Sequence, residues 1–303
     1  MLSVIIPTFN DEKNLPLSVT SALECTNVSE IIVVDDNSTD NTAKLLKEIS
    51  SNFCRVRFLK NKKNLGSGFS FIRGLSKAKN DYVIMLNSDD FFIPKGIDNL
   101  LSYTKINDLE VCYGKMGIKK QTGVFRYYHP GYMKESYVNR RNELTQLLIY
   151  DMYLPSFGTI IKKNVLKVFY NKEYYSELLQ EYGGYFKAHD YDLFINLAKQ
   201  KKKFGFLNET VCVWCPKENS QSGETYYNTG EACFESAFLF NRYADDVKFN
   251  YNEIELIESR VISRLAQKPT HVLFKNKKIL SHVDKFKKKI KKLKIEQKKT
   301  ANF

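Results

Sequence analysis

The stretch EIIVVDDNSTDNT, residues 30–42, joins an unbroken apolar run to a cluster of polar side chains. The run is rich in β-branched residues and shows no polar alternation, which is typical of a strand covered on both faces. The polar cluster favours a helix over residues 38–49, with Ser38 or Thr39 as its N-cap. A buried strand followed directly by a helix predicts one unit of a parallel α/β sheet.

The same alternation runs through the first 105 residues. Further strands are predicted at 3–7, 56–60 and 82–87, and further helices at 14–25, 69–78 and 94–103. Right-handed crossovers between these strands give a mostly parallel, Rossmann-like sheet, in which ligands bind beyond the carboxyl ends of the strands. The side chains that matter most therefore belong to three strand ends, PTFN at 7–10, DDNSTD at 35–40 and NSDD at 87–90.

The chain beyond residue 105 has a looser pattern. Strands are expected near 111–116, 158–162 and 210–215, a helix at 190–199, and helical structure over 230–265. We expect an α/β domain over 1–220, with a nucleotide-binding half at 1–105 and an acceptor half at 106–220. A helical region over 221–270 and a Lys-rich amphipathic tail over 271–303 are expected to follow.

The net charge of +13 is concentrated near the carboxyl end. Residues 284–299 hold nine Lys against Asp284 and Glu296, a local charge of +7 that makes up about half of the total. A hydrophobic content of 43% and a charged content of 27% are ordinary for a globular protein, which argues against global disorder. The opening residues carry no basic signal segment, and no apolar run approaches the roughly 18 residues of a membrane span, so a cytoplasmic protein is expected.

The six cysteines include one close pair, Cys212 and Cys215 in VCVWCP. A CxxC pair can serve redox chemistry or half of a zinc site, but no second pair and no paired His spacing supports zinc. Buried, reduced thiols on a strand are the expected outcome.

The first two strand ends narrow the range of ligands. PTFN has no Gly where a dinucleotide-binding fold brings its backbone close to a pyrophosphate, so a dehydrogenase of that fold is not expected. The chain also has no P-loop motif, so a P-loop nucleotide-binding protein is not expected. In DDNSTD, a carboxylate can accept a hydrogen bond from a base N–H or from ribose hydroxyls. The alternative is that residues 36–38 form only an Asx turn and a helix cap, and the residues alone leave both open.

The third strand end, NSDD, places Asp89 and Asp90 side by side. Adjacent anions repel unless they stay in water or hold a cation. Mg²⁺ and Mn²⁺ prefer oxygen ligands and are usually held by one or two carboxylates together with substrate phosphates. We expect Asp89 to be a metal ligand and Asp90 a sugar contact or an outer support. The alternative is an Asp-rich turn ahead of a helix that begins at Pro94.

A further acidic site lies in AHDYDLF, residues 188–194. Asp190 can cap the predicted helix, where the helix dipole favours a carboxylate. It can equally act as a general base that takes the proton of an acceptor hydroxyl. Asp192 continues inside the helix, so a structural role is expected for it.

Taken together, four segments resemble the motifs of the family 2 glycosyltransferases with the GT-A fold, in the family order. They are SVIIPTFNDEKNL, EIIVVDDNSTDNT, NLGSGFSFIRGLSKAKNDYVIMLNSDD and HDYDLFINLAKQKKKFGFLNE. The resemblance covers roughly residues 1–215. It implies an inverting transfer of a sugar from a nucleotide donor, most often a UDP sugar, to a hydroxyl of a glycan or lipid-linked acceptor. Synthesis of a surface polysaccharide or lipooligosaccharide is the expected setting.

The resemblance also implies roles for individual residues. The nucleotide-sugar site would be formed by Pro7, Thr8, Phe9, Asp35, Asp36, Asn64, Gly66, Asn87, Ser88 and Asp90. Asp89 would bind Mn²⁺ or Mg²⁺, and Asp190 would be the catalytic base.

Three positions depart from the family pattern. Asn87 replaces the first carboxylate of the metal motif, so a weaker metal site is expected. His189 stands where an acidic residue commonly precedes the base, and its charge decides whether the proton affinity of Asp190 rises or falls. VWCPKENSQS replaces an Arg and His motif, which leaves Lys217 as the candidate for a diphosphate contact.

The basic end has an apolar stripe. Val283, Phe286, Ile290 and Leu293 recur at helical spacing among the lysines, which predicts an interfacial helix over 283–299 on an anionic membrane. A solvated tail and a helix packed on a partner subunit are the alternatives. Nucleic acid is not an expected partner, because the aromatic residues are not interleaved with the basic cluster.

Two other functions stay open from the sequence. A metal-dependent nucleotidyltransferase shares a doubly wound sheet and paired carboxylates, but it would usually carry a Gly-rich basic loop after the first strand, and PTFNDEK has no Gly. A degenerate, non-catalytic member that binds glycan or serves as a scaffold is compatible with Asn87 and with the missing Arg and His motif.

Overall fold

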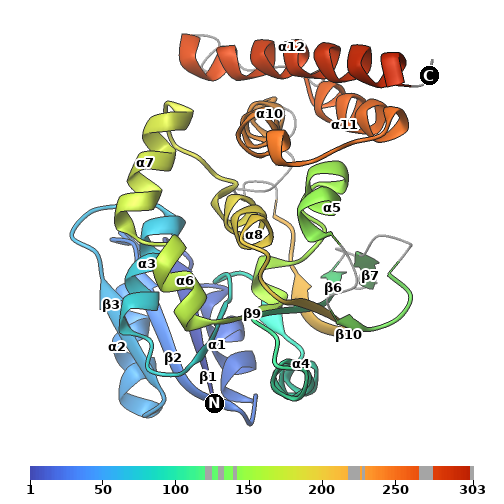
Figure 1. The fold of residues 1–303 in the computed structure, drawn as a ribbon. Coiled ribbons are helices and arrows are strands. Elements are labelled where there is room, and N and C mark those ends of the chain that lie inside the picture. Colours follow the sequence, from blue (N-terminus) through green and yellow to red (C-terminus); the bar gives the residue numbers. More distant parts are fainter. Residues whose placement is uncertain are drawn as a thin grey trace. The chain divides into compact units, whose positions relative to one another are not determined.

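The computed structural model describes residues 1–119, 125–128, 133–138, 142–217, 226, 229–265 and 276–300 (Figure 1). Contacts within the chain divide it into two compact units. The first consists of Met1–Arg140, Tyr153–Tyr175 and Lys201–Cys215, and the second of Arg141–Met152, Ser176–Gln200 and Pro216–Phe303. Each unit is made of several separate stretches of sequence. The domains expected from the sequence are continuous stretches with boundaries at residues 105, 220 and 270, and they stay a prediction.

The first unit contains a ten-stranded sheet. Eight of its strands lie in the order β3-β2-β1-β4-β9-β6-β10-β5, and the other two pair at the side of this path, β7 with β6 and β8 with β10. The strands are β1 (Leu2–Thr8), β2 (Val28–Asp35), β3 (Val56–Lys60), β4 (Tyr82–Met85), β5 (Phe91–Phe92), β6 (Val111–Lys119), β7 (Phe125–Tyr128), β8 (Tyr137–Val138), β9 (Thr159–Lys162) and β10 (Phe204–Trp214). Strands β1 to β4 are parallel, β6 is parallel to β10, and β9 runs antiparallel between β4 and β6. This mixed, mostly parallel sheet confirms the predicted α/β class.

Helices cover both faces of this sheet (Figure 1). Those of the first unit are α1 (Leu15–Leu23), α2 (Thr42–Asn52), α3 (Ser67–Lys77), α4 (Pro94–Ile106), α6 (Lys163–Phe169) and the start of α7 (Lys172–Tyr182). Alternate residues of β1 point to opposite faces, so Val4 and Ile6 join the core cluster that holds Leu15 of α1. Ile5 points the other way, toward α3, where a Cβ added to Gly74 would lie 2.4 Å from its Cγ2. Close packing of α3 on the sheet therefore requires Gly74.

The order of the strands reverses at β1. It pairs with β2 on one side and with β4 on the other, and Thr8 is the register partner of Asp35. The carboxyl ends of these three parallel strands therefore lie at one edge of the sheet, where open α/β sheets bind their ligands. All three polar strand ends singled out in the sequence follow strands of this group.

The second unit is helical. It holds α5 (Glu143–Tyr150), the end of α7, α8 (His189–Lys199), α10 (Glu231–Tyr243), α11 (Tyr251–Ser263) and α12 (Lys277–Thr300), with a 3-10 turn at Ala244–Asp246. The helical structure expected over 230–265 is present as two helices, α10 and α11. The break is explained by Asn250, whose side chain accepts from the Glu253 N–H while the Glu253 carboxylate binds the Asn250 N–H. This capping box begins α11 as a new helix.

The apolar stripe of α12 is buried inside the second unit. Val283, Phe286 and Ile290 are buried, and α12 packs on α10 and α11. The Phe286 ring meets Phe240 of α10 edge-on at 5.3 Å between centroids. The protein itself therefore covers these three side chains, and contact of residues 283–299 with an anionic membrane stays a prediction.

Strand β10 begins six residues earlier than the expected 210, and the short β5, β7 and β8 were not expected. None of the six cysteines, all of which lie in the described ranges, forms a disulfide bond, and burial raises the pKa of Cys212 well above its usual value. None of the helices in the described ranges is long and apolar enough to cross a bilayer.

Candidate active site at the strand ends

The loops that follow β1 and β2 are fastened to each other. Asn10 has a left-handed backbone, with φ of 50°, which Asn tolerates better than most residues. Its N–H donates to Ser38 Oγ at 2.9 Å, and its Oδ1 accepts from the Thr39 N–H at 2.8 Å. The Asp36 N–H donates to the Thr8 carbonyl at 2.8 Å, so the two strand ends form one rigid edge.

Thr8 and Asp35 carry two unsatisfied oxygens at this edge. Both side chains are almost fully buried, Thr8 at 3% and Asp35 at 0% exposure. Asp35 Oδ1 accepts from the Ser38 N–H at 2.9 Å, but Asp35 Oδ2 and Thr8 Oγ1 have no hydrogen-bond partner within the described residues. The nearest cation to Oδ2 is Lys60 Nζ at 3.7 Å. Because buried polar atoms are normally paired, this pair of oxygens is suited to the polar groups of a ligand.

Asp36 anchors the loop between β3 and α3. Its Oδ1 accepts from Asn61 Nδ2 at 2.6 Å and from the Leu65 N–H at 2.9 Å, and its Oδ2 accepts from the Gly66 N–H at 2.7 Å. Gly66 has φ of 89°, a conformation that favours glycine. A carboxylate has about four acceptor positions, so one is left on Oδ2 for a ligand. The structure thus places Asn64 and Gly66 on a loop that Asp36 holds, and contact of Asp36 with a base stays a prediction.

The NSDD turn holds Asp90 inward. Its side chain is 1% exposed, and Oδ2 accepts from Asn87 Nδ2 while Oδ1 accepts from the Cys215 N–H, both at 2.8 Å. Ser18 Oγ donates to the carbonyls of Ser88 and Asp90 at 2.7 and 2.6 Å. These contacts make Asp90 a support of the turn, and a contact of Asp90 with the sugar stays a prediction. Cys215 of the CxxC pair contributes its backbone to this arrangement.

Asp11 is a residue that the sequence reasoning missed. Ser88 Oγ donates to Asp11 Oδ2 at 2.7 Å, and Asn14 donates to the other oxygen of the same carboxylate. The end of β1 is thereby joined to the NSDD turn after β4. The signal was present, because Asp11 follows the first strand as closely as Asp89 follows the fourth.

A divalent cation is compatible with this edge of the sheet. Among the described residues, no group of three or more His, Cys, Asp or Glu side chains could hold a metal ion. Asp89, which is half-buried, would therefore need water and substrate phosphates to complete the coordination. Mg²⁺ and Mn²⁺ accept such mixed oxygen sets, so the donors present fit these ions when a diphosphate is bound.

Asp190 belongs to the second unit, where it is the second residue of α8. It is half-buried, and its Oδ1 accepts from the Tyr191 N–H at 2.9 Å. Burial lowers the pKa of His189, which is 5% exposed, and this outweighs the opposite effect of Asp190. His189 is then neutral near neutral pH and brings no charge beside the carboxylate. Asp192 is fully buried and accepts from the Tyr243 hydroxyl at 2.7 Å, a structural contact.

Lys217 also belongs to the second unit, just after the end of β10. The predicted site residues at the strand ends, from Pro7 to Asp90, all belong to the first unit, whereas Asp190 and Lys217 belong to the second.

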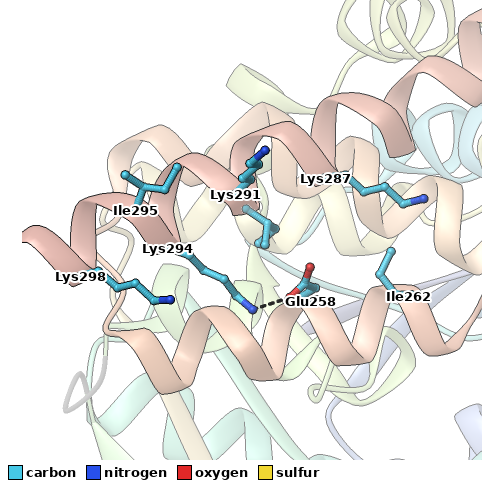
Figure 2. Close-up of a pocket in the computed structure, with 8 residues that line it drawn as sticks. Glu258, Ile262, Lys287, Lys291, Lys294, Ile295 and Lys298 are labelled. Atoms are coloured by element: carbon cyan, nitrogen blue, oxygen red, sulfur yellow. Dashed lines mark ion pairs between the residues drawn. The ribbon is translucent and has the colours of Figure 1, made fainter.

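A basic groove lies between α11 and α12 of the second unit (Figure 2). It has a volume of about 540 Å³ and is lined by Glu258, Ile262, Lys287, Ile290, Lys291, Lys294, Ile295 and Lys298. Lys294 Nζ forms an ion pair with Glu258 at 2.7 Å. Four lysines against one carboxylate make this surface attractive to anions.

The family model of glycosyl transferase family 2 matches residues 3–169, which is more than half of the chain. The chain belongs to glycosyl transferase family 2. The matched span of this family 2 member includes every strand-end residue described above and ends before Asp190.

Two curated relatives illustrate the range of similarity. The chain is 37% identical over 125 residues to the poly(ribitol-phosphate) beta-N-acetylglucosaminyltransferase TarP of Staphylococcus aureus (strain N315), which covers 39% of this chain and 37% of TarP. It is 26% identical over 214 residues to an uncharacterized glycosyltransferase of Methanocaldococcus jannaschii, which covers 69% of this chain and 68% of that protein. The match to TarP therefore spans well under half of the relative's length.

The fold is similar to that of S. aureus TarS. The crystal structure of TarS 1–349 in complex with UDP-GlcNAc matches with a TM-score of 0.64 at 18% identity, over 96% of this chain and 83% of that chain. The structure of the same TarS fragment in complex with UDP matches with a TM-score of 0.57 at 18% identity, over 87% and 71% of the two chains. At this identity the likeness shows the fold alone, and it confirms the expected GT-A class with a helical carboxyl-terminal region.

Proposed function

We propose that this family 2 member is an inverting glycosyltransferase that moves a sugar from a UDP sugar to a hydroxyl of a glycan or lipid-linked acceptor. The observation that carries the proposal is the pair of unsatisfied buried oxygens, Thr8 Oγ1 and Asp35 Oδ2, at the reversal point of the sheet. A nucleoside offers N–H and hydroxyl groups that would satisfy both. The existence of a TarS complex with UDP-GlcNAc and the name of TarP support a UDP sugar as donor.

The nucleoside would lie over the ends of β1 and β2. Phe9 is 46% exposed there, so its ring is available to the face of a base. Pro7 and Thr8 would border the nucleoside from β1, and Asp35 and the remaining acceptor position of Asp36 would hold the base or ribose. The loop that Asp36 anchors would bring Asn64 and Gly66 to the donor.

The metal site would be built on Asp89. Ser88 is fixed by Asp11, and Asn87 is fixed by Asp90, so the turn offers Asp89 from a rigid backbone. A bound Mn²⁺ or Mg²⁺ would supply charge that stabilises the departing diphosphate. Asn87 adds no charge of its own, and a weaker metal site than one with two carboxylates is expected.

Asp190 would act as the base. A carboxylate beside the acceptor hydroxyl can take its proton as the new bond to the anomeric carbon forms. A single displacement on the face opposite the leaving group inverts the configuration at that carbon. Burial lowers the pKa of His189, so the imidazole beside Asp190 is neutral.

The setting we propose is synthesis of a surface polysaccharide or lipooligosaccharide at the cytoplasmic face of the membrane. The exposed lysines of α12 support it, because they can contact anionic headgroups without inserting an apolar face. TarP, by its name, transfers N-acetylglucosamine to poly(ribitol-phosphate), which supports a polymeric acceptor for this chain as well.

The test is a panel of UDP sugars incubated with the full chain and Mn²⁺, with UDP release as the readout. Turnover of one sugar above the others supports a glycosyltransferase, and the product's anomeric configuration reports inversion. Binding of glycans without UDP release from any donor would favour the non-catalytic alternative that Asn87 keeps open. Release of pyrophosphate from a nucleoside triphosphate would instead indicate a nucleotidyltransferase.

A further inference from the structure

Glu235 of α10 is a buried carboxylate with a defined set of donors. Its side chain is 2% exposed. Oε1 accepts from the Lys187 N–H at 2.7 Å, and Oε2 accepts from the Ala188 N–H at 3.0 Å and from the Tyr226 hydroxyl at 2.6 Å. Two of these donors are consecutive backbone amides of a segment 47 and 48 residues earlier in the chain.

Those two amides come directly before α8. The helix begins at His189, and its N-cap residue, Ala188, has no side chain that can accept a hydrogen bond. Backbone N–H groups at a helix start need partners from elsewhere, and a carboxylate there is also favoured by the helix dipole. Glu235 meets this need from another helix. Because Asp190 is the second residue of α8, the peptides that Glu235 holds lie two and three residues before it.

The charged and titratable groups that face Glu235 come from several elements. Burial is the main reason why the pKa of Glu235 is raised to about 7, and the charge of Glu231 raises it further. The hydrogen bonds from the Tyr226 hydroxyl and from the two amides lower this pKa. Lys187 Nζ forms its ion pair with Glu231, one turn earlier on α10. Tyr182 of α7 is close enough for the charge of Glu235 to raise its pKa further.

We propose that Glu235 is a positioning residue for glycosyl transfer: its ionised carboxylate clamps the Lys187 and Ala188 amides and thereby fixes the turn that presents Asp190. The inference rests on the proposed role of Asp190 as the base. Glu235 touches neither donor nor acceptor in this scheme. Displacement of a catalytic group by about 1 Å can cost roughly 100-fold in rate, so a loosened turn reduces catalysis without touching the substrate.

The first test is Glu235→Gln, which keeps the size of the side chain. An amide has only one oxygen, so one of the two backbone N–H groups would face another donor. The expected result is a kcat lower by about tenfold or more. The KM for the UDP sugar should be unchanged, because the hydrogen bonds of Glu235 all go to the α8 turn and Tyr226. Thermal unfolding measured alongside shows that the variant is folded.

Two further variants shift the pH profile in opposite directions. Tyr226→Phe removes a donor that favours the carboxylate, so the acid limb of kcat should move to higher pH. Glu231→Gln removes a like charge, so the same limb should move to lower pH, with kcat at pH 8 to 9 close to wild type. If Glu235 had only a structural role, the acid limb of kcat would stay where it is in both variants.

The outcomes separate the inference from the proposed function. If Asp190→Asn is inactive while Glu235→Gln keeps wild-type kcat at every pH, the positioning role is overturned and the base assignment stands. If Asp190→Asn turns over at the wild-type rate, the base assignment fails and the positioning role fails with it. If Glu235→Gln does not fold, unshifted acid limbs in folded Tyr226→Phe and Glu231→Gln overturn the inference.

Discussion

Thr8 and Asp35 stand opposite each other at the last paired positions of β1 and β2, and each directs a buried oxygen that no described group satisfies. Folding normally pairs such atoms, because an unsatisfied buried polar group costs about 1 to 3 kcal/mol. The protein retains both at the one edge of the sheet where parallel strands reverse their order. The proposed account assigns them to the polar groups of a UDP sugar.

Thr8→Val should weaken nucleotide binding and strengthen the fold. The methyl group that replaces the hydroxyl has a similar size and needs no partner, so the free energy of unfolding should rise by about 1 kcal/mol. UDP affinity should fall by about tenfold, which corresponds to one lost hydrogen bond. Urea unfolding and calorimetric titration with UDP measure the two effects. Unchanged UDP affinity in the folded variant would exclude the Thr8 hydroxyl as a donor contact.

Asp36→Asn should damage stability through the β3–α3 loop. The new amide would place an NH₂ group against the Gly66 or Leu65 N–H, so the free energy of unfolding should fall by about 2 kcal/mol. Asp35→Asn is the matched control at the neighbouring position. It keeps the oxygen that accepts from Ser38, so its loss of stability in the same urea experiment should be smaller. Equal losses would show that the anchoring role of Asp36 is overstated.

Asp151 should make the second unit acid-sensitive. Burial alone would raise its pKa, but Arg260 and Arg264 outweigh burial and lower it to about 2. A carboxyl group with a lowered folded-state pKa adds stability above its unfolded value of about 3.8 and loses it as pH falls toward 2. The contribution is about 2 kcal/mol.

The check is the difference in unfolding free energy between wild type and Asp151→Asn at several pH values. Asn has the same size and branching as Asp, so the substitution adds little backbone strain of its own at this position, where φ is 70°. The difference should be largest at neutral pH and should narrow below about pH 4, where Asp151 of the unfolded wild-type chain begins to bind a proton while the folded state still holds it charged. Two parallel curves across this range would contradict the assignment.

The exposed lysines of α12 should bind anionic vesicles in a salt-dependent manner. Replacing Lys288, Lys292 and Lys299 with Gln should weaken vesicle binding by about 100-fold, at about 1 kcal/mol for each lysine near the surface. The control replaces Lys44, Lys47 and Lys201, which are exposed and lie far from α12 in the sequence. Flotation with anionic and zwitterionic vesicles distinguishes the two sets. Equal binding to both kinds of vesicle would contradict an electrostatic contact.

The first half of the fold was predictable because its signals are local. Apolar runs such as IIVV in β2 define buried strands, and the polar residues after them begin helices. The break between α10 and α11 also had a local signal, the Asn250 and Glu253 pair of a capping box, which was overlooked. Strands of two to four residues, such as β5 and β7, carry too few side chains for any period to show.

Contacts between distant segments were the part that the sequence did not reveal. The stripe on α12 predicted an amphipathic helix correctly, but helical spacing identifies a face and not the surface that covers it. Asp36 was expected to hold a base, and its bonds to amides 29 and 30 residues away were not foreseeable. Glu235 had no signal at all, because nothing in its neighbourhood on α10 indicates the turn before α8.

The most direct test of the central claim is a calorimetric titration with UDP of wild type and Asp89→Asn, each with Mn²⁺ and with a chelator. The account predicts that Mn²⁺ strengthens UDP binding to wild type and that this gain is absent in Asp89→Asn, while the weak metal-free binding is similar in both proteins. Wild-type binding that is equal with Mn²⁺ and with chelator would contradict a metal-bridged nucleotide site at the end of β4.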